Sequence, residues 1–180
     1  MITKTELITV RAKALEIYDK AHVILTDDEK ANIEVADFGL GDIYNTGLEI
    51  VTYVNTTRCC AKELALLPYQ TCPEHRHAPI AEKNYPGKEE TFRCRYGTVY
   101  LYVEGEETKN RQTSPPAAPD GSYTVFHEII LSPGEQYTLY PNTKHWFKSG
   151  AKGAVVSEFS TKSRDEFDIF TDKRIVRVEK

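Results

Sequence analysis

Residues 87–97, GKEETFRCRYG, decide the fold class, because their side chains alternate in character. The acid Glu90 heads a row that continues through Phe92 and Cys94, and the residues between them are polar or basic. A period of two places one row in a protein core and the other in water, which is typical of a β-strand with one buried face. We therefore interpret this stretch as a strand that carries an acid on its inward side.

Short β-rich runs flank this strand along most of the chain from Leu48 onward. Many short strands without helical crossovers predict an all-β sandwich or barrel. Residues 104–122, EGEETKNRQTSPPAAPDGS, are polar, proline-rich and aperiodic, which favours a long hairpin loop between two of these strands. The runs are LEIVTYV, CAKELALL, TFRCRY, TVYLYVEG, YTVFHEIIL, EQYTLY, KHWFKSG, AVVSEFS and IVRVE.

The N-terminal part of the chain has a helical pattern instead. The segments TKTE (3–6) and TDDE (26–29) both match the capping box, in which a hydroxyl and a carboxylate bind the free backbone amides of a helix start. Apolar residues recur at helical spacing between them. We expect helices over about residues 4–20 and 27–35 that pack on the outside of the β-structure.

Length and composition are those of an ordinary globular protein. The 180 residues fit one domain, with a helical segment over 1–35 and β-structure over 36–180. A net charge of −4 gives no electrostatic reason to expect nucleic acid or a membrane surface as a partner. None of the four cysteines forms a C-x-x-C pair, and the charged residues 1–20 lack the apolar core of a signal peptide. We therefore expect a cytoplasmic protein.

Three of the five histidines lie in contexts that suit metal binding. His75 and His77 form H-x-H, and alternate residues of a strand project from the same face, so two imidazoles can meet one ion. Glu90 is the expected acidic ligand, because a buried carboxylate needs a partner, whereas Glu89 belongs to the outward row. His145 follows a turn and begins an aromatic strand. We expect these three histidines and Glu90 to hold a divalent metal.

Two more ionisable residues occupy inward rows of predicted strands. Glu158 alternates with apolar and small residues, and a buried acid suits general-base work. Lys62 shares a row with two leucines, an unusual place for an ammonium unless it lines a polar cavity. The alternatives are an edge-strand glutamate and a lysine that reaches the rim of the barrel. His127 and Cys94 fit packing positions better than site positions.

The metal-ligand pattern resembles the two sequence motifs of the cupins. His75-x-His77, Glu90 and Gly97 resemble the first motif, and PNTKH at 141–145 resembles the second. The resemblance implies a small jelly-roll β-barrel in which three histidines and a glutamate hold a divalent metal and leave positions open for a substrate. It also implies a homodimer, because cupins often pair through edge strands.

Three departures from the cupin pattern stand out. Tyr69 occupies the place of a glycine six positions before His75, and twelve residues (78–89) separate His77 from Glu90 where three or four are usual. Asn142 replaces another glycine, a mild exchange because Asn tolerates a positive φ. The long gap implies an extended loop over the mouth of the barrel.

Four segments are similar to the bacterial D-lyxose isomerase family. The resemblance implies an enzyme that interconverts D-lyxose and D-xylulose, with D-mannose and D-fructose as related substrates, and that prefers Mn²⁺. It implies Lys62 and Glu158 as the catalytic pair, and Asp168 and Arg174 as residues that bind sugar hydroxyls. The segments are TCPEHRH, GKEETFRCRYGTVYLYVEGE, YPNTKHWF and DIFTDKRI.

Other functions remain compatible with the sequence. A sugar-phosphate isomerase would need a basic cluster at the barrel mouth, and Lys83, Lys88, Arg93 and Arg95 are available. A metal dioxygenase and a non-catalytic sugar-binding barrel would use the same metal ligands. The sequence leaves open whether hydrogen moves through a cis-enediol or by hydride shift.

Overall fold

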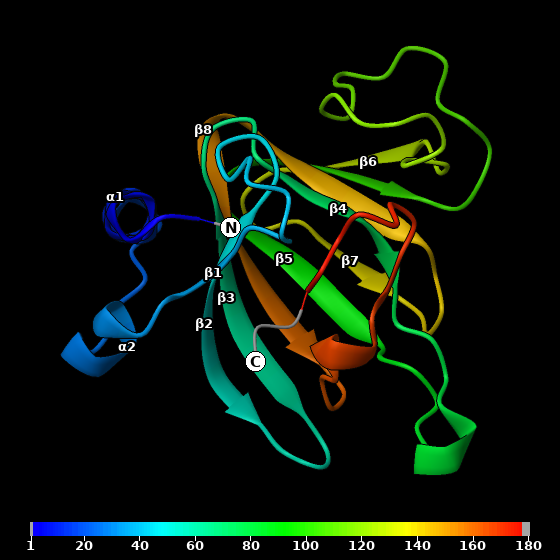
Figure 1. The fold of residues 1–180 in the computed structure, drawn as a ribbon, viewed down its shortest axis with the longest axis horizontal. Coiled ribbons are helices and arrows are strands. Elements are labelled where there is room, and N and C mark those ends of the chain that lie inside the picture. Colours follow the sequence, from blue (N-terminus) through cyan, green and yellow to red (C-terminus); the bar gives the residue numbers. More distant parts are fainter. Residues whose placement is uncertain (1, 178–180) are drawn as a thin grey trace.

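The computed structural model describes residues 2–177, which form a curled antiparallel β-sheet with two α-helices on its outer side (Figure 1). The helices are α1 (Lys4–Lys20), α2 (Asp27–Ala31) and two short 3₁₀ turns, η1 (Ala81–Lys83) and η2 (Asp165–Phe167). The strands are β1 (Glu34–Ala36), β2 (Leu48–Asn55), β3 (Cys60–Leu66), β4 (Thr71–Arg76), β5 (Glu90–Val103), β6 (His127–Leu131), β7 (Gln136–Leu139), β8 (His145–Ser160) and β9 (Ile169–Phe170).

The long pair of β5 and β8 closes the sheet into a barrel. The two strands run antiparallel from Glu90 opposite Ser160 to Val103 opposite His145, and β8 pairs on its other edge with β3 and β4. Fourteen extended residues span roughly 45 Å at the usual rise of a strand. Yet Oε1 of Glu90, at one end of the pair, lies 3.2 Å from Nε2 of His145 at the other. Both strands must therefore curl until their two ends meet.

Two glycines make this curl possible. Gly97 in β5 and Gly153 in β8 both have a φ of +74°, and they lie against each other. A Cβ on Gly97 would stand 2.0 Å from the carbonyl oxygen of Gly153, and one on Gly153 would stand 2.6 Å from that of Leu66. We expected Gly97 to end one strand and begin another, and likewise the runs 144–150 and 154–160 to be separate. That prediction is wrong, because glycine here bends a continuous strand.

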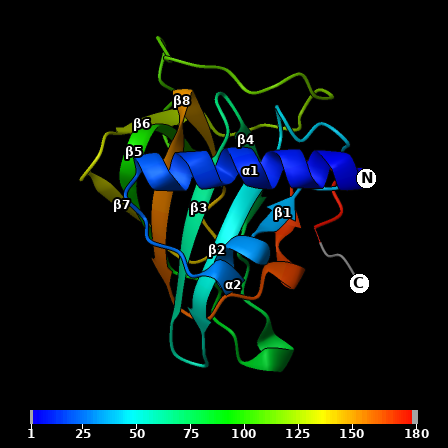
Figure 2. The same cartoon turned by 90° about the vertical axis from the view of Figure 1, so that its left-hand side faces the viewer.

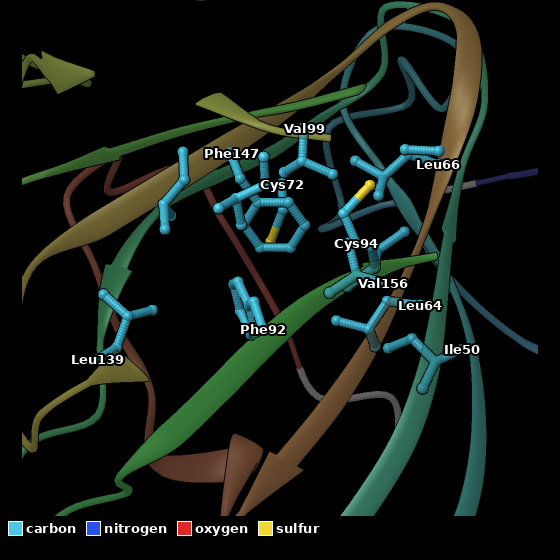
Figure 3. Packing of buried hydrophobic residues seen from close by; sticks show 14 of the residues in the cluster. Ile50, Leu64, Leu66, Cys72, Phe92, Cys94, Val99, Leu139, Phe147 and Val156 are labelled. Carbon is cyan, nitrogen blue, oxygen red and sulfur yellow. The ribbon is translucent and has the colours of Figure 1, made fainter. Parts of the chain in front are cut away.

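The inward rows of the curled sheet form the main core (Figure 3). Phe92 and Cys94 are buried, as the alternation of this strand predicted, and Cys94 packs among aliphatic side chains. Phe92 and Phe147, from β5 and β8, meet edge to face with 5.0 Å between ring centroids. This apolar layer fills one part of the barrel, so polar side chains gather only toward the other part.

Helix α1 crosses the outer side of the sheet, over β3 and β8 (Figure 2). It buries Val10, Ala14, Ile17 and Tyr18 against the strands, and its predicted capping box is present at Thr3. Neither α-helix of the described residues combines the length and the apolar character that a membrane span needs.

Helix α2 is shorter than the sequence predicted. It ends at Ala31 rather than near residue 35, because the side chain of Asn32 donates a hydrogen bond back to the carbonyl of Asp28 and stops the helix. From Glu34 the chain forms β1 as an edge strand, with Glu34 opposite Ile50 of β2. Backbone hydrogen bonds to the sheet thus replace those of another helical turn.

The polar connection between β5 and β6 is a long loop, as predicted, although it extends to residue 126 and shortens the expected strand at 123–131. The buried carboxylate of Glu74 holds it in place, because it accepts hydrogen bonds from the backbone amides of Thr124 and Val125. The expected strand at 175–179 is absent over 175–177, and the rest of it lies outside the described residues.

Two glycine positions of the cupin motifs keep a positive φ although other residues fill them. Asn142 has a φ of +67°, as expected for an Asn that replaces Gly. Tyr69 has a φ of +62°, and its side chain is 57% exposed. A tyrosine gains nothing from this conformation, so the turn between β3 and β4 imposes it.

A buried acid lies on the outer side of the barrel, away from the polar interior. Glu49 is inaccessible to solvent, and its Oε1 accepts a hydrogen bond of 2.9 Å from Gln70 while its Oε2 has no partner. Burial raises the pKa of Glu49 from its usual value near 4.5 to about 8, and the hydrogen bond from Gln70 offsets only part of this effect. The folded protein therefore holds this proton more tightly than the unfolded chain does.

We predict that Glu49 makes the fold less stable as pH rises. Its contribution is complete below pH 4.5 and is lost as pH passes 8, a change on the order of 5 kcal/mol. Urea unfolding of the Glu49→Gln variant should show a much flatter loss of unfolding free energy between pH 5 and 8 than wild type. The exposed-site control Glu16→Gln should follow wild type. Parallel profiles for Glu49→Gln and wild type would contradict the prediction.

Candidate metal centre

Three histidines meet at one end of the barrel interior. His75 lies in β4, His77 follows the end of this strand, and His145 begins β8 directly opposite His75. All three are buried, and their ring centroids are 4.3 to 5.5 Å apart. One nitrogen from each ring lies within 4.8 Å of the others, a spacing at which a single ion can be bound by all three.

Hydrogen bonds on the far side of each ring orient the histidines. Nδ1 of His75 lies 2.8 Å from the carbonyl oxygen of Pro73, and Nδ1 of His145 lies 3.0 Å from that of Thr143. A carbonyl only accepts, so both Nδ1 atoms must carry the proton and Nε2 keeps its lone pair for the interior. Burial, together with the neighbouring rings of His145 and His77, lowers the pKa of His75 well below its usual value, which keeps this ring neutral.

Glu90 completes the cluster. Its Oε1 lies 3.2 Å from Nε2 of both His77 and His145, but without hydrogen-bond geometry. Oε1 and both Nε2 atoms are buried without a hydrogen-bond partner, whereas Oε2 lies against the Lys88 ammonium. Such groups are costly to bury unless something binds them, and these donors fit a divalent cation. Glu89, which the strand phase placed outward, is exposed.

Lys88 is a site residue that the sequence analysis named only as a candidate for a basic cluster at the barrel mouth. It is 3% exposed, and its Nζ lies 2.7 Å from Oε2 of Glu90 and 3.0 Å from Oε1 of Glu158. Burial would lower the pKa of Lys88, but Glu158 and Glu90 outweigh it and raise the pKa well above its usual value. Burial likewise opposes ionisation of Glu90, yet Lys88 and His77 hold its pKa well below the usual range. Lys88 precedes Glu90 by two residues, so the same alternation could have placed it inward.

Lys62 and Glu158 lie where the sequence suggested, on the same wall of this cavity. They are directly opposite each other in the β3–β8 pair, and both are buried. Nζ of Lys62 lies 2.6 Å from Oδ2 of Asp165 and 3.1 Å from Oγ of Ser163. Burial lowers the pKa of Lys62, but Glu158 and Asp165 more than compensate and raise it. Nothing in the sequence indicated Asp165 as a site residue, because it lies in an irregular segment without a strand or helix period.

The two residues predicted to bind sugar hydroxyls lie in different places. Asp168 lines the cavity, and its Oδ1 lies 2.5 Å from Nδ1 of His77. Arg174 is bound to Asp172 instead, is half exposed, and does not line the cavity. Arg177 does line it and forms an ion pair with Glu34 at 2.7 Å.

His77 differs from the other two histidines, because acids flank both of its nitrogens. Burial and Lys88 oppose its protonation, but Glu90 and Asp168 raise the pKa of His77 to about 9. A positive charge on the ring of His77 is therefore favourable. A cation bound at Nε2 would supply such a charge as well. His127 lies apart, half-buried at the start of β6, with its Nδ1 3.0 Å from the carbonyl oxygen of Glu106.

Comparisons with known proteins give relatives along the whole chain. The sequence model of the D-lyxose isomerase family matches residues 18–180. A D-lyxose/D-mannose isomerase of Thermosediminibacter oceani is 60% identical over 178 residues, 99% of this chain and 97% of the relative. A D-lyxose ketol-isomerase of Cohnella laeviribosi is 57% identical over 174 residues, 97% of this chain and 94% of the relative.

Solved structures match the fold at low sequence identity. The L-ribose isomerase of Acinetobacter sp. DL28 in complex with L-ribose has a TM-score of 0.77 at 15% identity and covers 97% of this chain and 94% of its own. The ligand-free L-ribose isomerase of Cellulomonas parahominis has a TM-score of 0.75 at 15% identity, with 96% and 94% covered. The predicted all-β cupin barrel with helices packed outside is thereby confirmed.

We predict that Glu90→Gln weakens Mn²⁺ binding by at least about 100-fold, since it removes the negative ligand from the cluster. Calorimetric titration with Mn²⁺ measures the effect, and circular dichroism checks that the variant folds. Glu89→Gln is the matched control and should bind Mn²⁺ as wild type does. If Glu90→Gln bound the metal as tightly as wild type, the assignment of this ligand would be wrong.

Asp168→Asn should weaken Mn²⁺ binding by about 10- to 100-fold, because the carboxylate no longer orients and polarises the ring of His77. The exposed Asp120→Asn variant provides the control for loss of one negative charge. An unchanged Mn²⁺ affinity in Asp168→Asn would show that the contact with His77 does not support the metal centre.

Proposed function

The chain belongs to the D-lyxose isomerase family, and from this premise we propose that it interconverts D-lyxose and D-xylulose at a divalent metal held by His75, His77, Glu90 and His145. As a member of this family it is an enzyme, an aldose–ketose isomerase. D-mannose and D-fructose are proposed as the second substrate pair, since one relative is named for both aldoses.

The observation that carries the proposal is the set of buried nitrogen and oxygen atoms without partners in the wall of one cavity. Nε2 of His77, Nε2 of His145 and Oε1 of Glu90 converge there. Three imidazoles and one carboxylate suit Mn²⁺, Fe²⁺ or Zn²⁺, and we propose Mn²⁺. When bound, the metal would act as a Lewis acid that polarises the carbonyl and hydroxyl oxygens of the sugar.

The reaction moves one hydrogen between C1 and C2 of the sugar. In the enediol route, Glu158 removes the proton from C2 of the aldose and returns it to C1, while the hydroxyl proton on O2 moves to O1. The Lys88 ammonium lies 3.0 Å from Oε1 of Glu158 and so fixes the position of this carboxylate in the cavity. Lys62, held by Asp165 and Ser163, supplies a fixed positive charge for the oxygens on which negative charge develops.

Substrate contacts are proposed for Asp168, which lines the cavity next to His77. Arg174 stays a prediction, but its side chain is engaged by Asp172 outside the cavity lining, and Arg177 is the arginine available there. The cavity favours a free sugar over a sugar phosphate. Arg93 does not line the cavity and binds Gln136 instead, and the basic residues that do line it, Lys62, Lys88 and Arg177, all have carboxylate partners.

Cytoplasmic location and a homodimer complete the proposal. All four cysteines are free thiols, which agrees with a reducing compartment. Edge strands of the curled sheet, such as β1, offer a place for a second copy to pair.

The decisive experiment is to incubate the purified protein with Mn²⁺ and D-lyxose and to measure ketose. We expect wild type to form D-xylulose, and Glu158→Gln to lose about 10²- to 10⁴-fold in kcat at unchanged Mn²⁺ content, because the general base is removed. Glu166→Gln, an exposed acid on the neighbouring η2, is the control. Deuterium from D₂O should appear at C1 of the ketose, because the proton held by Glu158 can exchange with solvent, whereas a hydride shift would introduce none.

Absence of ketose from both D-lyxose and D-mannose would overturn the proposed function. Full activity of Glu158→Gln would instead leave the function standing and remove Glu158 as the base.

A further inference from the structure

A second pocket lies at the end of the barrel where β5 begins and β8 ends, and we call it the outer basic pocket. It has a volume of about 340 Å³ and is lined by the tip of the β2–β3 hairpin, the loop around η1 and the segment after β8. These three segments lie at the same end of the molecule in both views (Figures 1 and 2). The pocket shares no lining residue with the cavity at the histidine cluster.

The lining of the outer basic pocket is strongly cationic in a chain whose net charge is −4. Arg58, Lys83, Lys162 and Arg164 contribute four positive charges, and the described lining contains no acid. Thr57 and Thr161 add hydroxyl groups. Four cations around one concave site create a positive potential that favours an anion.

These cations are poorly neutralised by the protein itself. Arg164 reaches a carboxylate only at 3.9 Å, in Glu166, and its buried Nε has no hydrogen-bond partner. Lys83 lies over the ring of Phe167, 5.0 Å from its centroid, rather than beside an acid. Within residues 2–177, Arg58 and Lys162 have no ion pair. The protein itself therefore leaves these positive charges available to an anion in the pocket.

The segment behind the pocket also supports the other cavity. Lys162 and Arg164 point to the outer basic pocket, whereas Ser163 and Asp165, which alternate with them, bind Lys62. The hydroxyl of Tyr85, also in the lining, donates to the carbonyl of Lys162 at 3.0 Å. A ligand on the outer cations therefore contacts the same short segment that positions Lys62.

We propose that the outer basic pocket binds the phosphoryl group of a small phosphorylated sugar. Two guanidinium groups offer paired donors that match phosphate oxygens, and two ammonium groups add charge. The pocket is large enough to hold part of a sugar beside the phosphate. Resting on the proposed function, the ligand class is a ketose phosphate, because phosphorylation is a reaction that would consume the free ketose formed at the metal centre.

Calorimetric titration of the Mn²⁺-loaded, full-length protein tests the site with two probes, inorganic phosphate and D-fructose 6-phosphate. The pocket variant is Arg58→Gln/Lys162→Gln, and Lys109→Gln/Lys152→Gln is the control with the same loss of charge at exposed positions elsewhere. We expect the pocket variant to bind D-fructose 6-phosphate at least tenfold more weakly than wild type and the control within twofold of it. Turnover of D-lyxose without phosphate should be the same in all three proteins.

Equal affinities in the pocket variant and the control would overturn the proposal, because binding would then not depend on the pocket. Competition between D-fructose 6-phosphate and D-lyxose would also overturn it, because the anion would then bind at the metal centre. Inorganic phosphate that bound as tightly as the ester would rule out a sugar phosphate as the intended ligand. A change in kcat or KM on adding D-fructose 6-phosphate to wild type, absent in the pocket variant, would support communication through residues 162–165. The calorimetric titration needs no turnover. Its result can therefore be interpreted even if the protein proves not to be an isomerase.

Discussion

The paired bend of β5 and β8 at Gly97 and Gly153 is the constraint on which the rest of the structure depends. Without it, Glu90 and His145 would lie at opposite ends of a long strand pair, instead of 3.2 Å apart. The bend tolerates no side chain, because each glycine has a carbonyl oxygen against the place where a Cβ would be. Closure of the barrel thus brings Glu90 to the histidine cluster, in which His75 and His145 already face each other across the β4–β8 pair.

Closure gathers charge that would be costly to bury separately. The described lining of the central cavity contains four carboxylates and three basic side chains, which leaves one negative charge before the histidines are counted. Each basic group lies within 3.0 Å of a carboxylate, so the Coulomb attraction offsets much of the desolvation cost. The remaining negative charge belongs to a set of acids that surrounds the three imidazoles, and this imbalance favours a bound cation. The groups are Glu90, Glu158, Asp165, Asp168, Lys62, Lys88 and Arg177.

Much of this arrangement could be predicted from the sequence, and the limits have physical reasons. Strand alternation separated buried Glu90 from exposed Glu89, since period two is a local property of the chain. The same rule would have found Lys88, but a lysine is normally assigned to the surface, and its burial is possible only because two acids meet it. Asp165 and Arg177 lie in irregular segments, where no period indicates direction.

The long connection between His77 and Glu90, residues 78–89, contains most of the features by which this chain differs from the cupin pattern. A shorter connection would keep the proposed metal ligands, which lie in the strands or directly after one, but it would remove η1 with Lys83. Inside, the connection delivers Lys88 between Glu90 and Glu158. Outside, it supplies Lys83 and Tyr85 to the outer basic pocket. The same insertion therefore contributes residues to both cavities. For this physical reason, residues 78–89 are where a link between the metal centre and a ligand of the outer basic pocket should be sought.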